Sequence, residues 1–152
     1  QEGIEHMLFA ELLYTSNLLM NPKIRWITFH GSADFCYLVK MLINTNLPHQ
    51  EKKFYPLLNT FFPRLYDLKY IMRDCRDLNG GLQYISDSLK VTREGYAHHA
   101  GSDSLTTGKL FFIFLERYFE NTIFEDKYCG RLFGYNNMDS IENLKNFYGE
   151  SK

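Results

Sequence analysis

The amino-acid sequence predicts an α/β fold, because short strand-like segments alternate along the chain with longer segments of helical periodicity. The stretch IRWITFH at 24–30 is short, β-branched and aromatic, and it predicts a buried strand. The stretch RLYDLKYIM at 64–72 is ambiguous, and one interpretation is a short strand that runs into a helix near Asp67. Two or three strands are few for so many helices, so the sequence predicts a thin sheet.

The composition narrows the class of protein. The chain has 152 residues, which suits one domain, and 16% of them are aromatic, so material for a core is abundant. Seventeen basic residues nearly balance eighteen acidic ones. This balance argues against a non-specific nucleic-acid coat or a binder of anionic membranes, but it is compatible with a local basic groove. The longest purely apolar run, LFFIFL at 110–115, is far shorter than a membrane span.

The cysteines indicate the redox compartment. Cys36, Cys75 and Cys129 lie far apart in the sequence and form no C-x-x-C pair. This pattern excludes a zinc module and a disulfide framework, and it favours a reduced intracellular compartment. Cys36 and Cys75 fall on apolar helical faces, so we expect both thiols to be inert.

The first half of the chain contains three predicted helices. The first ends at Asn21–Pro22, and the second begins with Ser32 as its N-cap. The third contains Pro56, which is expected to split it, and ends at Pro63. Each helix is indicated by a stripe of apolar residues: Phe9, Leu12 and Leu13 in the first; Phe35, Leu38, Val39 and Leu42 in the second; Phe54, Leu57, Leu58 and Phe61 in the third.

Two more helices are predicted after the turn at Gly80–Gly81. The loop GYAHHAG at 95–101 separates them, and the later helix runs from Ser102 to about Asn121. This long helix is apolar almost all round, so we expect it to be buried on several sides. The residues after Tyr135 are polar and predict a peripheral helix or a tail. The earlier helix is indicated by a stripe of Leu82, Ile85 and Leu89.

The stretch YAHHAGSDSLTTG contains the first candidate site. If a helix begins near Ser102, Asp103 lies in its first turn and His98 in the loop ahead, so both side chains can point at one cavity. A carboxylate can hold a hard divalent cation, and a neutral imidazole can take a proton from a nearby water. The structural alternative stays open, because Asp is favoured in a first helical turn and a loop His is usually just solvated.

Further acidic residues occupy similar positions. Asp34 follows the first predicted strand and lies in the first turn of a helix, at the edge of the sheet where such folds keep their sites. Asp67 has the same context, and each of the two can equally be an ordinary residue at a helix N-terminus. His30 ends an apolar strand and is interpreted as a satisfied core or edge histidine. His99 adjoins His98, and neighbouring side chains point in different directions, so both are not expected to serve one site.

Four blocks of the sequence together closely resemble the Caf/Pop catalytic deadenylase, a nuclease subunit of the eukaryotic CCR–NOT complex: WITFHGSADFCYLVKMLINTNLP, FFPRLYDLKYIMRDCRDLNGGLQ, HHAGSDSLTTGKLFF and KYCGRLFGY. That family belongs to the DEDD superfamily of 3′-to-5′ exonucleases, so the resemblance implies an RNase H-like α/β fold. It runs from about residue 3 to residue 135 in near-continuous register. It implies that 1–135 form the C-terminal part of a CAF-type ribonuclease domain, followed at 136–152 by a peripheral helix or flexible tail.

The resemblance also implies roles for individual residues. Asp34 looks like the acidic residue of the family's second motif, and Asp103 looks like that of the third. His98 looks like the histidine that gives the "h" subtype its name. Asp34 and Asp103 would then be metal ligands, and His98 would orient or deprotonate the attacking water. Asp67 matches no metal-ligand position and falls in a structural block.

The implied activity is the shortening of poly(A) tails of mRNA with release of AMP, using two divalent cations, Mg²⁺ or Mn²⁺. Such a pair lies roughly 3.5–4 Å apart, activates the water and stabilises the leaving 3′ oxygen. Preference for poly(A) is expected from a single-strand groove, base stacking and 2′-hydroxyl contacts. The implied partners are the poly(A) tail, the NOT scaffold subunit, a leucine-rich-repeat deadenylase and antiproliferative adaptor proteins, with no membrane and no DNA. The implied location is the cytoplasm, with the nucleus as a second compartment.

One departure from the family concerns the metal ligands. The family's first motif, D-x-E followed by F-P-G, supplies an Asp and a Glu to the shared metal, and it occurs nowhere in this chain. We therefore expect the chain to be part of a longer protein and inactive alone. A second chain that supplies the first half and a natural fragment that keeps binding surfaces are the alternatives. The missing motif also keeps open a non-catalytic bridging or scaffold function, whereas Asp34, His98 and Asp103 favour an enzyme.

Overall fold

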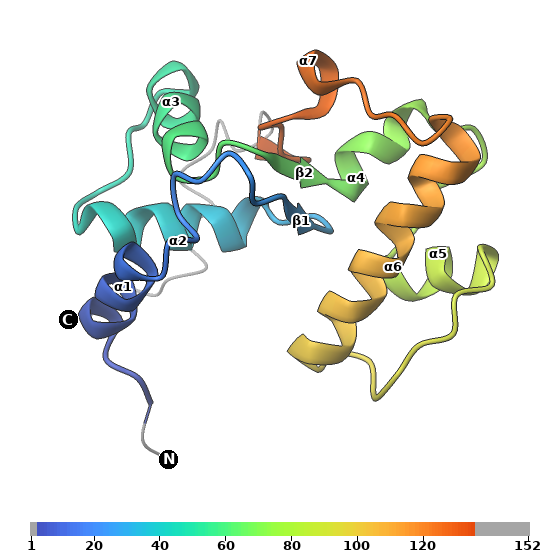
Figure 1. Ribbon diagram of the computed structural model, residues 1–152, viewed down its shortest axis with the longest axis horizontal. Helices are drawn as coiled ribbons and strands as arrows, with labels where there is room; N and C mark the ends of the chain where they lie inside the picture. The colour runs from blue at the N-terminus through green and yellow to red at the C-terminus, as the bar shows by residue number, and fades with distance from the viewer. Residues whose placement is uncertain (1–2, 136–152) are drawn as a thin grey trace.

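A two-stranded parallel sheet lies between two groups of helices (Figure 1). The computed structural model describes residues 3–135, and the predicted tail at 136–152 lies outside the described residues. Strand β1 (Trp26–Thr28) pairs with β2 (Leu65–Asp67), with Thr28 opposite Asp67. The α/β class, the thin sheet and the short strand that runs into a helix at Asp67 are confirmed.

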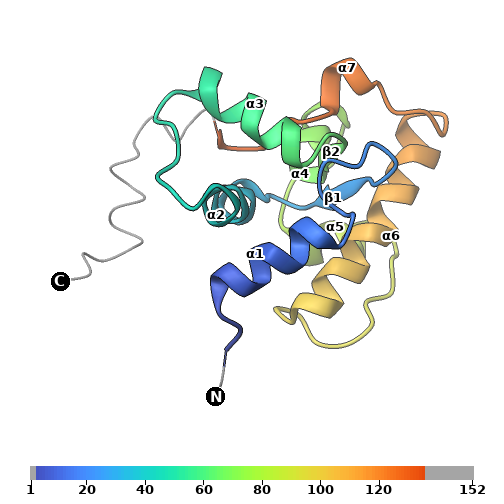
Figure 2. The same ribbon diagram turned by 60° about the vertical axis from the view of Figure 1, so that its left-hand side comes forward.

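The two faces of the sheet pack against different hydrophobic clusters, because successive side chains of a strand point to opposite faces. Trp26 and Leu65 join a cluster with three helices on one face, and Ile27 and Tyr66 join a second cluster on the other. Figure 2 shows the sheet from another side, with a layer of helices on each face. The helices are α1 (His6–Thr15), α2 (Ser32–Ile43) and α3 (Glu51–Phe61) on the first face, and α4 (Leu68–Ile71), the 3₁₀ helix η1 (Met72–Asp74), α5 (Leu82–Ser88) and α6 (Ala100–Tyr118) on the second, with α7 (Glu125–Tyr128) following α6.

Helix α2 begins directly after a tight corner that follows β1. The N-cap is Gly31, so the prediction of Ser32 as the N-cap is wrong, and Ser32 is the first helical residue. The Phe35 backbone N–H donates to the Gly31 carbonyl at 2.9 Å, which fixes the start of the helix. A Cβ at Gly31 would collide with the side chain of Thr28, so the close approach of this corner to β1 requires glycine.

Helix α3 is continuous from Glu51 to Phe61, so the prediction that Pro56 splits it is wrong. Proline removes one backbone donor from the helix. The buried side chains of Phe54 and Leu58 nevertheless hold both halves of α3 on the same cluster. This packing outweighs the lost hydrogen bond, and the Pro56 carbonyl accepts a 2.8 Å bond from the Thr60 hydroxyl.

Helix α1 ends at Thr15, earlier than the predicted stop at Asn21–Pro22. The connection to β1 contains Asn17 and Met20 in the left-handed region, with φ of 61° and 55°. Two successive left-handed corners are incompatible with a continuing helix. The helix therefore stops where the chain turns toward the sheet, a tertiary constraint that the apolar stripe does not report.

Two predicted burials are only partly correct. Strand β1 is half-buried rather than buried, because β2 is its single partner among residues 3–135. Helix α6 buries Leu110, Phe111 and Phe114 but leaves Phe112 69% exposed, since no described segment covers that side. None of the described helices has the length and apolarity needed to cross a membrane.

Candidate functional site

Asp103 lies in the first turn of α6, as the sequence predicts, although the helix begins at Ala100 rather than Ser102. Its backbone N–H donates to the His99 carbonyl at 2.9 Å, which closes the first turn over the preceding loop. The Asp103 side chain is 34% exposed. The carboxylate is therefore accessible from solvent at the N-terminus of a long helix, whose dipole favours negative charge there.

Arg93 holds this carboxylate from the loop that precedes α6. Its Nη1 donates to Asp103 Oδ1 at 2.5 Å and to Ser102 Oγ at 3.1 Å, and its Nε donates to Gln83 Oε1 at 2.6 Å. The Arg93 side chain is only 11% exposed. The hydrogen bond from Arg93 holds the pKa of the Asp103 carboxyl below its usual range, and the backbone N–H of His98 acts in the same direction.

Sequence reasoning missed Arg93. It stands ten residues before Asp103, and no periodicity or motif connects two positions across a loop of that length. The contact depends on how the loop at 94–101 folds back on the helix that follows it. It defines a fixed stem, made of Arg93, Ser102 and Asp103, for the loop that carries His98.

His98 occupies the predicted loop and is exposed. Its φ of 64° is in the left-handed region, which is uncommon for a residue with a side chain, although His is enriched there. Because Arg93 pins one end of this loop and α6 begins at the other, the position of His98 relative to Asp103 is set by short-range geometry. His98 and Asp103 are neighbours at the start of α6, since the backbone N–H of His98 acts on the Asp103 carboxyl.

Asp34 lies in the first turn of α2 and is exposed. It follows the carboxyl end of β1, the edge at which β2 also ends. Carboxylates at this edge of an open α/β sheet are well placed for a site. Helix α2, which carries Asp34, lies on one side of the sheet, whereas α6, which carries Asp103, lies on the other (Figure 1).

Asp67 fixes the corner that leads to Asp34. The Asp67 Oδ1 accepts hydrogen bonds from the backbone N–H groups of His30 at 2.8 Å and Lys69 at 3.0 Å. Its Oδ2 accepts from those of Gly31 at 3.2 Å and Phe133 at 3.0 Å. The side chain is fully buried, and burial raises the pKa of its carboxyl while the four backbone donors oppose that shift. Asp67 is thus committed to backbone donors, which agrees with the structural role that the sequence indicates.

The donors that are present fit a hard cation by type but not by number. Asp34 and Asp103 offer carboxylate oxygens, the ligands that Mg²⁺ and Mn²⁺ prefer. Within residues 3–135, however, no group of three or more His, Cys, Asp or Glu side chains is placed to hold a metal ion. The thiols of Cys36 and Cys75 are buried, and burial raises the pKa of each to about 11, so neither is a candidate ligand at neutral pH.

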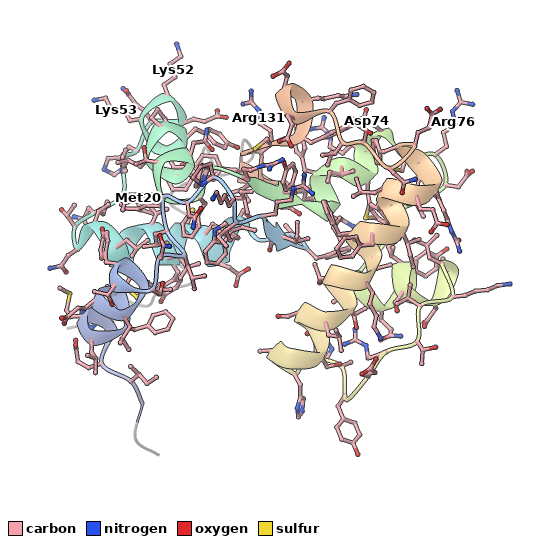
Figure 3. All side chains as sticks on the ribbon, in the orientation of Figure 1. Met20, Lys52, Lys53, Asp74, Arg76 and Arg131 are labelled. Atoms are coloured by element: carbon pink, nitrogen blue, oxygen red, sulfur yellow. The ribbon has the colours of Figure 1, made fainter. Side chains whose placement is uncertain are left out.

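Arg93→Gln is expected to loosen the loop at 92–99 and to lower Tm by about 3–8 °C. The reason is that the side chains of Gln83, Ser102 and Asp103 lose their hydrogen-bond donor at a nearly buried position. Arg93→Lys should give an intermediate result, since it keeps the charge and loses the planar fork. Hydrogen exchange of the loop amides and thermal melting measure both effects. Arg76, which points away from the body of the molecule (Figure 3), provides the control Arg76→Gln. Equal exchange rates in the Arg93 and Arg76 variants would contradict the role of the stem.

Comparison with known sequences identifies a protein family and several named relatives. The CAF1 family ribonuclease domain matches residues 9–111 of this chain. Probable CCR4-associated factor 1 homolog 7 of Arabidopsis thaliana is 42% identical over 132 residues, which cover 87% of this chain and 47% of the relative. Poly(A) ribonuclease pop2 of Schizosaccharomyces pombe is 41% identical over 139 residues, which cover 91% of this chain and 41% of the relative. The chain thus spans less than half the length of these two relatives.

Solved structures give the same result. The structure of S. pombe Pop2p in its Mg²⁺- and Mn²⁺-bound form matches with a TM-score of 0.81 and 42% identity, covering 87% of this chain and 52% of that one. A chain in the structure of the yeast NOT1 MIF4G domain co-crystallised with CAF1 matches with a TM-score of 0.72 and 25% identity, covering 86% and 54%.

These matches show that the chain has an RNase H-like α/β fold of the DEDD nuclease type, as the sequence predicts. The chain covers about half of each matched chain. The chain belongs to the CAF1 family of ribonucleases.

Proposed function

We propose that this chain is part of a poly(A)-specific 3′-to-5′ exoribonuclease, an mRNA deadenylase that releases AMP. The observation that carries the proposal is its 41% identity to a protein named poly(A) ribonuclease, with Asp34, His98 and Asp103 all inside the matched CAF1 segment. Asp34 and Asp103 each lie in the first turn of a helix, where a carboxylate is reachable from solvent.

The roles follow from side-chain chemistry. Asp34 and Asp103 would hold two divalent cations, Mg²⁺ or Mn²⁺, through their carboxylate oxygens. When bound, the cations would activate water and stabilise the leaving 3′ oxygen. His98 would orient the attacking water and accept its proton, which a neutral imidazole can do near neutral pH. Arg93 would keep the Asp103 carboxylate in one orientation.

The number of donors limits what this chain does alone. Two carboxylates and one imidazole are too few to hold two divalent cations firmly, and the chain contains no D-x-E motif. We therefore propose that the 152-residue chain by itself does not degrade poly(A), and that two further carboxylates complete the site.

Partners and location belong to the same proposal. The CAF1 neighbour crystallised with a NOT1 MIF4G domain supports docking on a NOT scaffold subunit. A leucine-rich-repeat deadenylase, antiproliferative adaptor proteins and the poly(A) tail complete the proposed set. The proposed location is the cytoplasm, with the nucleus as a second compartment.

A bridging, non-catalytic subunit is the second candidate function, and one surface favours it. Helix α1 exposes Met7, Leu8 and Leu12, at 42%, 50% and 52%. A hollow of about 440 Å³ lies between α1 and α2 and is lined partly by Tyr14 and Met41. Exposed apolar patches of this kind mark protein-binding surfaces.

The two functions are separated by an exonuclease assay on the full-length protein. With Mg²⁺ or Mn²⁺ we expect stepwise shortening of a 5′-labelled oligoadenylate, release of AMP, and no reaction after chelation of the metal. An oligouridylate of the same length should be shortened more slowly, and the isolated 152-residue chain should be inactive. A full-length protein that shortens no oligoadenylate would sink the enzyme proposal. Robust shortening by the isolated chain would refute the proposed shortage of donors.

A further inference from the structure

The loop that carries His98 also displays an aromatic side chain for which the proposed chemistry has no use. Tyr96 is 80% exposed, the highest exposed fraction among the large apolar side chains of residues 3–135. It stands two positions before His98 in the same loop. Single exposed apolar residues are common on protein surfaces, so exposure alone carries no argument.

The neighbour of Tyr96 makes the position more specific. The ring of His99 lies beside that of Tyr96, with the centroids 5.8 Å apart and the planes inclined by 52°. Two rings from one loop, here named the Tyr96–His99 pair, therefore flank His98. His99 is itself exposed, so both rings remain reachable from solvent.

The loop is held in place, so the pair does not have to be ordered by a ligand. Arg93 closes its stem onto Ser102 and Asp103. Gly95, with φ of 82°, packs so closely that a Cβ there would lie 3.3 Å from the Ser102 Cβ. Binding to a preorganised loop avoids most of the entropy that ordering would cost.

The charge around the pair also permits an anionic ligand. The loop carries one acidic residue, Glu94, and its carboxylate is paired with Lys109 at 2.5 Å. The negative charge beside Tyr96 is therefore offset. A phosphodiester strand can approach the pair without facing an unpaired carboxylate of the loop.

We propose that the Tyr96–His99 pair is a stacking platform for one unpaired nucleobase of the RNA strand that enters the site. This inference rests on the proposed function, since it assumes a single-stranded RNA substrate. Every base has a π-face that stacks on an aromatic side chain, and adenine offers a large one. Because the platform flanks His98, the stacked nucleotide lies close to the proposed scissile bond, and Tyr96 affects which 3′ ends bind productively.

The test measures binding in the full-length protein with an Asp34→Asn substitution, which is intended to prevent hydrolysis. The probe is a fluorescein-labelled oligoadenylate, and its Kd is measured by anisotropy. Tyr96→Ala should weaken binding about tenfold, near the lower end of stacking contributions measured for such platforms. Tyr96→Phe and Tyr96→Trp should bind like the parent, whereas Tyr96→Leu should bind as weakly as Tyr96→Ala because it is apolar without a π-face.

A matched control and a positional scan complete the experiment. Phe124 is 65% exposed and lies between the C-terminal end of α6 and α7, so Phe124→Ala should leave the Kd unchanged. An oligoadenylate with one abasic position should bind the Tyr96→Ala variant and its parent equally when that position is the stacked one. A Kd independent of residue 96, full binding by Tyr96→Leu, or a loss that is the same for every abasic position would overturn the proposal.

The readouts separate this inference from the proposed function. In the protein that retains Asp34, unimpaired shortening with the same KM in Tyr96→Ala would contradict the stacking platform and support the exonuclease activity. Absence of shortening, combined with binding that depends on an aromatic residue 96, would contradict the exonuclease activity and support an RNA-binding platform. Equal melting temperatures for Tyr96→Ala and its parent are expected, since the side chain is mostly exposed.

Discussion

Replacing Asp67 with alanine is expected to destabilise the protein by about 3–5 kcal/mol, because several backbone N–H groups lose their acceptor and each unsatisfied buried donor costs about 1–3 kcal/mol. The fully buried carboxylate accepts four backbone N–H groups, from His30, Gly31, Lys69 and Phe133. Alanine would leave these four donors without their acceptor, and that of Gly31 lies in a buried hydrogen bond. For a chain of this size, Tm should fall by about 10–15 °C, which thermal melting measures.

Two further variants show whether the effect comes from the carboxylate. Asp67→Asn keeps the volume but turns an NH₂ group toward two of the backbone donors, so it should also be strongly destabilising. Asp126 is an exposed acidic residue in the first turn of α7, and Asp126→Ala should change Tm by less than about 2 °C. An Asp67→Asn variant as stable as wild type would show that the four hydrogen bonds contribute little.

The position of Asp67 explains why loss of its carboxylate would disturb several segments of the chain. Its donors belong to the β1–α2 corner, the start of α4 and the segment after α7, which are far apart in sequence. One side chain thus joins three segments at the carboxyl edge of the sheet. We expect the corner that presents Asp34 to move when this link is removed.

Local patterns predicted the elements well where packing and periodicity agree. The stripe of Phe54, Leu58 and Phe61 gave α3, and the β-branched run near Trp26 gave β1. The errors have tertiary causes. Pro56 is tolerated because α3 packs firmly, and α1 ends early because the chain must turn toward the sheet.

The site was predictable only in part. The positions of Asp34 and Asp103 in first helical turns follow from local signals, and the structure confirms both. Arg93 has no local signal, because its partner lies across a loop. Asp67 looks like Asp34 in sequence, and its burial, which depends on segments as distant as Phe133, is what distinguishes the two.

Asp34→Asn is expected to lower the proposed metal-dependent exonuclease rate of the full-length protein about 10³-fold. An amide of the same size lacks the negative charge that a divalent cation requires, and loss of about 4 kcal/mol of transition-state stabilisation gives that factor. Because Asp34 is exposed, the substitution should leave Tm nearly unchanged. Initial rates of oligoadenylate shortening and thermal melting measure the two effects. Asp126→Asn, another exposed acid in a first helical turn, is the matched control and should retain full activity.

Asp34→Cys tests whether the lost group is a metal ligand. A thiolate is a softer donor than a carboxylate and suits Mn²⁺ better than Mg²⁺, so activity should recover partly in Mn²⁺ and stay low in Mg²⁺. Equal activities in the two metals would assign Asp34 another role. The two aspartates should therefore differ in their effects on stability and activity. Asp67→Ala lowers both together, because it releases the backbone that carries the proposed metal ligand Asp34. Asp34→Asn lowers activity alone, because it removes the ligand from a backbone that stays in place.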